Sequence, residues 1–456
     1  MKTKFTPVTG SIVAPRGFLA SGIFCDIKRL GTGKGSEKGR KRDLALIVSE
    51  VPAAVAGMFT TNQICAAPVK VCIQRVKKGV AQAIVVNSGN ANACTGKQGL
   101  QDAFTVTDLV AQALHMPAEQ VLVGSTGRIG VMLPMDNLKR GIRDAVTRLG
   151  NSPECANHAA EAILTSDTRP KQIAVEFRLD GKTVRIGGIC KGAGMIQPAM
   201  SATGRRPATM PGRANRTGAR NGGRPQRHAT MLCFITTDAA IGAKALQTAL
   251  AEAVAQSFNR VTVDGDMSTN DTVLLLANGL AGNFEMRHSS SELRTFQSAL
   301  YHLCLELAKM IVRDGEGVSR FVTVRLSGAR TPAEADAAAR SVANSSLVKT
   351  SWNGGDPNWG RIIDALGYSS AKIVEDRVDI GYSAPRDRKI LWSLKRGQPT
   401  KAGFTVLCRA VAAEEFDLHI NLNLGTASAV IYAADLTEEY VDFNKGDVSD
   451  PASLGG

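Results

Sequence analysis

One threonine combines the residue type and the setting that nucleophilic chemistry requires. Thr230 stands directly before an apolar run, residues 231–235, which predicts a strand. A threonine hydroxyl is a weak nucleophile, but it becomes a strong one when the α-amino group of the same residue takes its proton. Such an amine titrates at about pH 7.7 to 8.0, where a general base works well. This chemistry requires cleavage of the bond between Ala229 and Thr230, which would free the amine.

A glycine-rich turn precedes this threonine in the chain. Lys191, Gly192 and Gly194 belong to the segment KGAGMIQPAM, residues 191–200. Because glycine has no Cβ, its backbone can approach a bound substrate closely. An insert of 28 residues, 201–228, separates this turn from Ala229, and it is rich in Gly, Pro, Arg, Ser and Thr. That composition predicts a flexible loop.

A second loop could stabilise negative charge on a reacting carbonyl group. Residues 124–130 read GSTGRIG and follow a short predicted strand. Acyl transfer needs hydrogen-bond donors aimed at the oxyanion that develops in the reaction. Thr126 and Gly127 can present a hydroxyl and a backbone N–H together. By itself the loop fits an ordinary turn equally well, but together with Thr230 it predicts an oxyanion hole.

Other catalytic patterns are missing from the sequence. It contains no GxSxG elbow, and its six histidines fall into neither a Ser-His-Asp nor an HExxH pattern. None of the nine cysteines forms a CxxC pair, so no zinc site is predicted. The carboxylates of Asp264, Asp266 and Asp271 lack the EF-hand spacing, and they predict turn caps and hydrogen-bond anchors instead. We therefore expect no metal and no cofactor.

The positive charge is concentrated in the insert. The formal net charge is +14, and residues 201–228 contain seven arginines and no acidic residue. Such a segment could bind a polyanion in a salt-dependent manner. No aromatic residue lies among the arginines to stack on bases, however, so we do not expect nucleic-acid binding.

Several features favour a cytoplasmic globular protein. The hydrophobic fraction of 44% is sufficient for a packed core. No run of 18 apolar residues occurs, so no membrane span is expected. The N-terminus has no continuous apolar stretch typical of a secretory signal, and the odd number of scattered cysteines suits a reducing compartment.

The elements that must position these loops follow from the hydrophobic periodicity. The length of 456 residues predicts two or three domains. Helices are predicted at residues 100–114, 135–149, 153–164, 243–258, 291–312 and 332–345. Strands are predicted at residues 44–48, 83–87, 121–123, 173–179, 183–189, 231–235, 321–326, 372–379, 403–408, 417–422 and 428–433. Asp180 and Gly181 predict a tight hairpin turn, and Thr331 with Pro332 predicts a capped helix start.

With the insert looped out, residues 191–200 join residues 229–232 and complete the pattern KGxGMIxPxMATML. This pattern resembles the glutamate N-acetyltransferase (ornithine acetyltransferase) family, whose precursors are cut just before the threonine. The blocks VAGMFTTNQICAAPV, NSGNANACTG and VTVDGDMSTNDTVLLLANG extend the resemblance over nearly the whole chain. It implies an α/β fold of two domains with mixed sheets, of the N-terminal-nucleophile type. We expect one domain at residues 1–200 and the other at residues 230–456, which cleavage would separate into an α and a β chain.

The resemblance also implies the residues of the site. Thr230 is the nucleophile and a substrate contact, cleavage occurs between Ala229 and Thr230, and Thr126 and Gly127 form the oxyanion hole. Glu316 would hold the substrate's ammonium group. The remaining expected substrate contacts are Thr168, which has Thr165 as an alternative nearby, and Lys191, Asn444 and Ser449.

The function that follows is an acetyl transfer from N2-acetylornithine to glutamate through an acetyl-threonine enzyme, in arginine biosynthesis. The resemblance further implies an α2β2 heterotetramer of self-cleaved chains and no cofactor, with acetyl-CoA as a possible second acetyl donor. Two alternatives stay open. One is a hydrolase or aminopeptidase that uses the same threonine with water as acceptor. The other is an uncleaved binding protein whose arginine-rich insert contacts an acidic partner.

Overall fold

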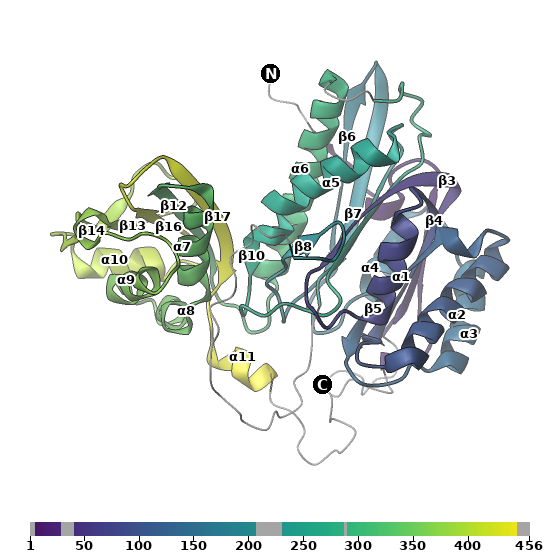
Figure 1. Cartoon of the computed structure of the whole chain (residues 1–456), viewed down its shortest axis with the longest axis horizontal. Helices are drawn as coiled ribbons and strands as arrows, with labels where there is room; N and C mark the ends of the chain where they lie inside the picture. The colour runs from purple at the N-terminus through teal and green to yellow at the C-terminus, as the bar shows by residue number, and fades with distance from the viewer. Residues whose placement is uncertain (1–4, 29–40, 207–229, 287–289, 445–456) are drawn as a thin grey trace, which may run out of the picture.

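The chain forms two β-sheets. The computed structural model describes residues 5–28, 41–206, 230–286 and 290–444. Within these residues lie one sheet of ten strands and one of seven. Figure 1 shows them in two bodies side by side, the first coloured purple to teal and the second green to yellow. The predicted mixed α/β class with two sheets is confirmed.

The first body contains the larger sheet. Its strands are β1 (Thr6–Pro7), β2 (Phe18–Ile23), β3 (Leu44–Thr60), β4 (Val80–Asn90), β5 (Val121–Arg128), β6 (Lys171–Leu179), β7 (Lys182–Lys191), β8 (Met200–Ser201), β9 (Leu232–Thr237) and β11 (Thr272–Ala277). Its helices are α1 (Ala67–Val76), α2 (Gly96–Leu114), α3 (Met135–Thr147), α4 (Pro153–Ala162), α5 (Ala243–Gln256) and α6 (Ser291–Arg313). None of the helices in the described ranges combines the length and the apolar character that a membrane span needs.

One long strand organises this sheet. The first half of β3 pairs with β2 and β4, and its second half pairs with β11. Pro52 lies between the two halves, where the register with β4 shifts between Val48 and Ala53. Proline has no N–H for a strand ladder, so the regular pairing breaks here. The sheet thereby divides into a β2–β5 half and a β11–β9–β7–β6 half.

The two halves pack against each other. A Cβ on Gly124 in β5 would come 3.2 Å from the ring of Phe234 in β9, so the strands lie close across the layers. Leu232, Phe234 and Leu274 share one hydrophobic core with β4 and β5. Helices α5 and α6 pack on the other face of the β9 half, while α1 to α4 contact β2, β3 and β5. Figure 1 accordingly shows α2 and α3 on the far side of the sheets from α5 and α6.

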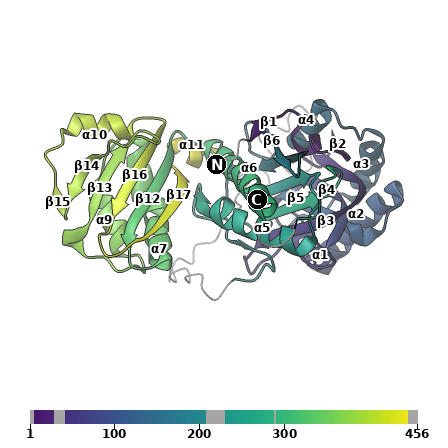
Figure 2. The ribbon, with the colours of Figure 1, turned by 90° about the horizontal axis from the view of Figure 1, so that it is seen from above.

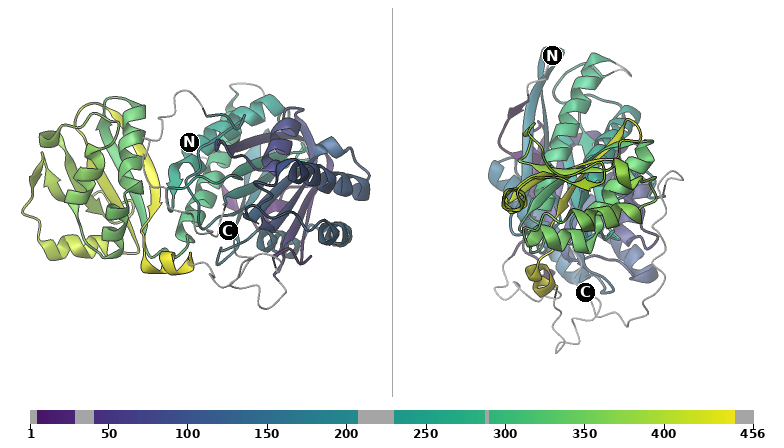
Figure 3. Two further views of the ribbon diagram at one scale, coloured as in Figure 1. Left: turned by 60° about the horizontal axis from the view of Figure 1, so that its bottom comes forward. Right: turned by 90° about the vertical axis from the view of Figure 1, so that its left-hand side faces the viewer.

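The second body has its own core. Its sheet runs β10 (Val261–Thr262), β17 (Ala427–Ala434), β12 (Phe321–Ala329), β16 (Glu415–Asn421), β13 (Asp379–Ser383), β14 (Leu391–Lys395) and β15 (Gln398–Pro399). Its helices are α7 (Pro332–Asn344), α8 (Ser346–Asn353), α9 (Trp359–Gly367) and α10 (Phe404–Val411). A last helix, α11 (Glu438–Phe443), lies between the two bodies in Figures 2 and 3.

Two local predictions are confirmed. Asp180 and Gly181 join β6 to β7 with φ angles of 50° and 72°, which suits a tight two-residue hairpin. Thr331 caps α7, because its Oγ1 accepts the N–H of Glu334 at 3.2 Å, and Pro332 occupies the first turn.

Two strand predictions near the C-terminus are wrong. Residues 403–408 fall in the helix α10 instead, with Leu407 and Val411 buried one turn apart against the core of the second body. Residues 372–379 contain a 3-10 turn, and the strand β13 begins only at Asp379. Short runs rich in β-branched and aromatic residues fit both types of element, and packing decides between them.

The expected domain boundary also differs from the sheet boundary. β9 and β11, which follow the insert, pair with β7 and β3 inside the first body. The second sheet begins with β10, although α6 still packs on the first body. A cut before Thr230 would therefore leave two chains interleaved in one sheet.

Candidate active site

Thr230 lies two residues before β9 and is almost completely buried, with 2% of its surface exposed. Its Oγ1 lies 2.7 Å from the Oγ of Ser268. The strands β9 and β11 are parallel, with Leu232 opposite Thr272, so the residues before each strand meet at the same edge. This pairing brings Thr230 beside residues 268–271.

Two hydrogen bonds hold Ser268 in place. Its carbonyl accepts the hydroxyl of Thr60, the last residue of β3, at 2.7 Å, and its Oγ accepts the N–H of Asn270 at 3.1 Å. With one lone pair of Oγ engaged by Asn270, the Ser268 hydroxyl can donate its proton to Thr230. The Thr230 proton would then be free to point elsewhere, as a nucleophile requires.

Thr126 and Gly127 lie at the end of β5. Gly127 has a φ of +130°, and a Cβ there would come 2.3 Å from the carbonyl carbon of Gly89 in β4. Only glycine fits this close approach of two backbones. The side chain of Asn270 ties the loop to the nucleophile's side of the site, because its Nδ2 donates to the carbonyl of Ser125 at 2.9 Å.

Lys191 is the last residue of β7 and is fully buried. Its Nζ lies 2.7 Å from the Oγ1 of Thr165 and 3.3 Å from the Oγ1 of Thr126. The carboxylate of Asp167 is 3.7 Å away. Burial lowers the pKa of Lys191, and Asp167 opposes this by favouring the charged form. Lys191 is paired with Leu232 at the end of the β7–β9 ladder, and Thr230 lies two residues before Leu232 in the chain.

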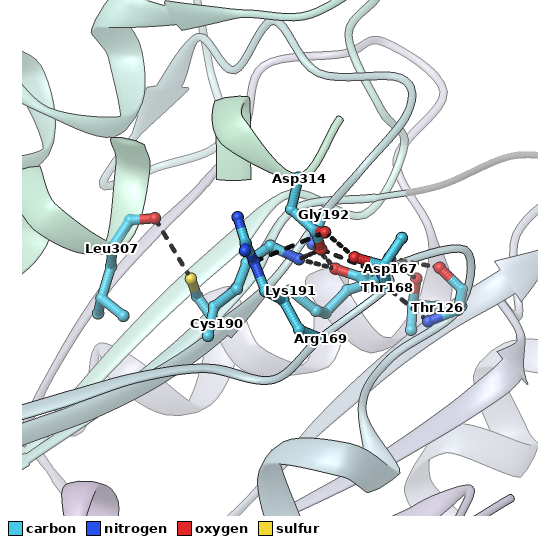
Figure 4. A network of polar contacts seen from close by, with 11 residues as sticks. Thr126, Asp167, Thr168, Arg169, Cys190, Lys191, Gly192, Leu307 and Asp314 are labelled. Carbon is cyan, nitrogen blue, oxygen red and sulfur yellow. Dashed lines mark hydrogen bonds and ion pairs between the residues drawn. The ribbon is translucent and has the colours of Figure 1, made fainter. Parts of the chain in front are cut away.

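Figure 4 shows Lys191 in a network of polar contacts with Asp167 and Asp314 nearby, and a second buried lysine, Lys171, contacts both of these carboxylates. The Nζ of Lys171 contacts Asp167 at 2.6 Å and also contacts Asp314. Burial works against ionisation of Asp167, but Lys171 and Lys191 together hold the pKa of its carboxyl well below the usual range. The hydroxyl of Thr168 donates to Asp314, and its N–H does so at 3.1 Å. Thr168 is therefore engaged within the protein.

Glu316 and Asn444 meet in a separate contact. The Nδ2 of Asn444 donates to Glu316 Oε2 at 3.0 Å. A Cβ on Gly194 would lie 2.6 Å from the same oxygen, so the glycine-rich turn runs directly past this carboxylate. Burial raises the pKa of Glu316, and Asn444 opposes the rise. Asn444 follows α11, which brings it back to the first body (Figure 1).

Some predicted site residues lie outside the described ranges. These are Ala229, Ser449 and residues 207–228 of the insert. For the described ones, contacts link Thr126 to Lys191 and Asn444 to Glu316, while Thr230 is linked to the oxyanion loop through Ser268 and Asn270.

Sequence reasoning did not find three polar residues of this site, which are Asp167, Ser268 and Asn270. For Ser268 and Asn270 the signal was the polar run STND before the apolar run of β11. The carboxylate of Asp271, the last residue of this run, was expected to anchor backbone groups, and it does so, since its Oδ1 accepts the backbone N–H of Met231 at 3.1 Å. Burial raises the pKa of Asp271 to about 7, although the backbone N–H groups of Met231 and Ser268 near its carboxylate oppose the rise.

Comparisons with known proteins agree on one family. A family profile described as "ArgJ family" matches residues 28–446. The arginine biosynthesis bifunctional protein ArgJ of Symbiobacterium thermophilum is 44% identical over 437 residues, which is 96% of this chain and 98% of that protein. The glutamate N-acetyltransferase of Methanocaldococcus jannaschii is 41% identical over 443 residues, with the same shares covered, 96% and 98%.

Solved structures were matched as well. The ornithine acetyltransferase of Mycobacterium tuberculosis, crystallised with ornithine, is 38% identical with a TM-score of 0.39, and the match covers 43% of this chain and 100% of that chain. The arginine biosynthesis bifunctional protein ArgJ of Bacillus halodurans is 42% identical with a TM-score of 0.41, covering 44% and 100%. By the extent of the family match and by the identity to relatives over nearly the full length, this chain belongs to the ArgJ family.

Proposed function

We propose that the protein is a self-cleaving acyltransferase that moves an acetyl group from N2-acetylornithine to glutamate in arginine biosynthesis. One observation carries the proposal: the buried hydroxyl of Thr230, just before β9, lies 2.7 Å from Ser268, in the part of the site that Asn270 links to the Thr126–Gly127 loop. The relatives named glutamate N-acetyltransferase and ArgJ support the choice of reaction.

Cleavage is the first chemical step of the proposal. The Oγ of Thr230 attacks the carbonyl carbon of Ala229, and the peptide bond is replaced by an ester while the nitrogen of Thr230 gains a proton. Water then hydrolyses the ester. The products are residues 1–229 and 230–456, and the second chain begins with a free α-amino group on Thr230.

Acetyl transfer follows with the same atom. The Oγ of Thr230 attacks the acetyl carbon of N2-acetylornithine, and its proton passes to the α-amine. The hydroxyl of Thr126 and the N–H of Gly127 donate hydrogen bonds to the oxyanion. The C–N bond breaks, the nitrogen of ornithine takes the proton, and glutamate then attacks the acetyl-threonine ester. Each oxyanion donor of this kind contributes about 10²- to 10³-fold to the rate.

The charges around the threonine suit an amino-acid substrate. Lys191 is a buried cation that could bind a carboxylate, and Glu316 is a buried carboxylate that could bind an ammonium group. An incoming ammonium would favour the ionised form of Glu316, whose pKa burial has raised. Asn444 would orient Glu316, and Thr168 and Ser449 stay predicted substrate contacts. Thr165 is the better placed threonine of its loop, because its hydroxyl touches Lys191.

Other parts of the proposal rest on the family alone. They are the α2β2 assembly, the cytoplasmic location, the lack of a cofactor, and the use of acetyl-CoA as a second donor. The nine free thiols suit a reducing compartment. Acetyl-CoA use is tested by supplying it with glutamate in place of N2-acetylornithine and measuring N-acetylglutamate.

The test of the transfer measures the products from N2-acetylornithine with and without glutamate. We expect ornithine and N-acetylglutamate in equal amounts, with ping-pong kinetics. Ornithine and free acetate formed at the same rate without glutamate would contradict the proposal and support the hydrolase instead. The Thr230→Ala variant is the control, and it should form neither product.

A further inference from the structure

Asp271 has one oxygen atom that the described part of the chain leaves without a partner. The residue is fully buried, and its Oδ1 accepts the N–H of Met231. Its Oδ2 is buried as well, and no group in the described residues forms a hydrogen bond with it, although the backbone N–H of Ser268 lies near enough to the carboxylate to lower its pKa. A buried carboxylate oxygen without a donor destabilises a folded protein. Such an oxygen is suited to bind a hydrogen-bond donor that is absent from the intact chain.

A second carboxylate of the same sheet shows the usual arrangement. Asp238 follows the other end of β9 and is also fully buried. Its Oδ1 accepts the backbone N–H of Arg185 at 2.7 Å, and its Oδ2 accepts the backbone N–H of Arg16 at 3.2 Å. Burial raises the pKa of Asp238, as it does for Asp271. The two residues differ in that both oxygens of Asp238 are satisfied by the intact chain.

The donor that Asp271 lacks is one that cleavage would create. Its Oδ1 already binds the N–H of Met231, the residue directly after Thr230. Cleavage before Thr230 would turn the amide nitrogen next to this N–H into an ammonium group with three N–H bonds. We infer that Asp271 is a positioning residue for the nucleophile, and that its free oxygen receives the α-ammonium group of mature Thr230. This inference rests on the proposed function.

The arrangement would give the proton of the reaction a defined route. The Oγ atoms of Thr230 and Ser268 share a hydrogen bond in which either can donate. When Ser268 donates, the Thr230 proton is free to pass to the α-amine as the bond from Oγ to the acetyl carbon forms. Asp271 then stabilises the resulting ammonium. When the C–N bond of the donor breaks, the ammonium returns this proton to the leaving nitrogen. The ammonium beside Asp271 favours the ionised form of its carboxyl, so Asp271 keeps its negative charge through these steps.

The pH dependence of the reaction should record this contact. Besides the amine, Lys191 on β7 and Asp264 before β11 are the charged groups that act on Asp271. An anionic Asp271 raises the pKa of the amine next to it, and the amine must be deprotonated to act as the base. Asp271→Asn removes the charge while it keeps an oxygen for Met231. At low pH the rate falls because the amine becomes protonated. This acid limb of the pH–rate profile should move to lower pH in Asp271→Asn.

The experiment compares full-length Asp271→Asn, Asp271→Glu and Asp238→Asn with the wild type. For each, the extent of cleavage is measured by mass, the melting temperature is recorded, and kcat and KM for acetyl transfer are measured from pH 5.5 to 9. We expect cleaved Asp271→Asn to lose about 10- to 100-fold in kcat, the effect of one charge-assisted hydrogen bond. Its acid limb should shift down by about one pH unit. Asp271→Glu and Asp238→Asn should keep the wild-type acid limb.

Two outcomes would overturn the inference. An unchanged acid limb in Asp271→Asn would show that the carboxylate does not contact the amine. A folded Asp271→Asn that remains uncut, while Asp238→Asn is cut, would assign Asp271 to the cleavage step instead. A wild type that is uncut or transfers no acetyl group would contradict the proposed function itself. This outcome is measured on the wild type alone, so it is distinct from the two outcomes that concern the Asp271 variants.

Discussion

At the scale of single residues, the central contact is the one between Thr230 and Ser268. The type and setting of Thr230 could be predicted from the sequence, because an N-terminal threonine needs nothing more to supply both nucleophile and base. Ser268 could not be predicted, since it lies 38 residues away and meets Thr230 only through the pairing of β9 with β11. The choice between Thr165 and Thr168 has the same difficulty, because one hydroxyl faces Lys191 and the other faces Asp314.

Removing the Ser268 hydroxyl should slow transfer. Ser268→Ala loses one neutral hydrogen bond to the nucleophile, which contributes about 0.5 to 1.5 kcal/mol, so kcat should fall about 2- to 13-fold with little change in KM. Ser257→Ala is a matched control, because Ser257 is a buried serine at the end of α5 whose hydroxyl donates to the carbonyl of Ala253 at 2.6 Å. Equal kcat values for the two variants would refute an orienting role for Ser268.

At the scale of elements, periodic segments were predicted well and bent or short ones were not. The helix α6 (Ser291–Arg313) was predicted at residues 291–312, because its leucines recur on one face over six turns. The strand β3 was predicted over only its first five residues, since Pro52 interrupts the pattern and the strand changes partners there. The site depends on this bend, because Thr60 at the end of β3 holds Ser268.

The tight loop after β5 gives a test at this scale. Gly127→Ala should lose at least about 100-fold in kcat, because the new Cβ would lie 2.3 Å from the backbone of Gly89 and would displace an oxyanion donor. Gly130 is the control in the same loop. Its φ is +83° and a Cβ added there would meet no heavy atom within 4 Å, so Gly130→Ala should cost about 1 kcal/mol of stability but retain activity. Transfer assays and thermal melts separate the two effects.

At the scale of the whole molecule, segments far apart in the chain meet beside the glycine-rich turn. Glu316 precedes β12 in the chain, and Asn444 follows α11 after β17, the last strand of the second sheet. The helix α11 lies between the two bodies in Figures 1 and 3.

The two ends of the insert also converge. Met200 pairs with Thr60, and Thr60 contacts both Ser268 and the carbonyl of Asp271, which adjoin Thr230. The looped-out insert that the motif implied is consistent with this geometry, although no pattern in the chain indicated that Thr60 would join the ends.

Deleting residues 207–228 should therefore leave the enzyme intact. The deletion keeps β8 and joins chain ends that converge near Thr60, so we expect cleavage before Thr230 and a kcat within about threefold of the wild type. The wild type and the deletion variant should bind a DNA duplex equally weakly in 150 mM salt. Binding that is strong in the wild type and lost on deletion would instead favour a role for the seven arginines in contacting a polyanion.

The most direct measurement is the intact mass of the purified protein under denaturing conditions. The account predicts two chains in the wild type, the second of which begins at Thr230 by N-terminal sequencing, and one uncut chain of 48.2 kDa in Thr230→Ala. A wild type that stays at 48.2 kDa would contradict the central claim, because Thr230 would then have no free amine to act as its base.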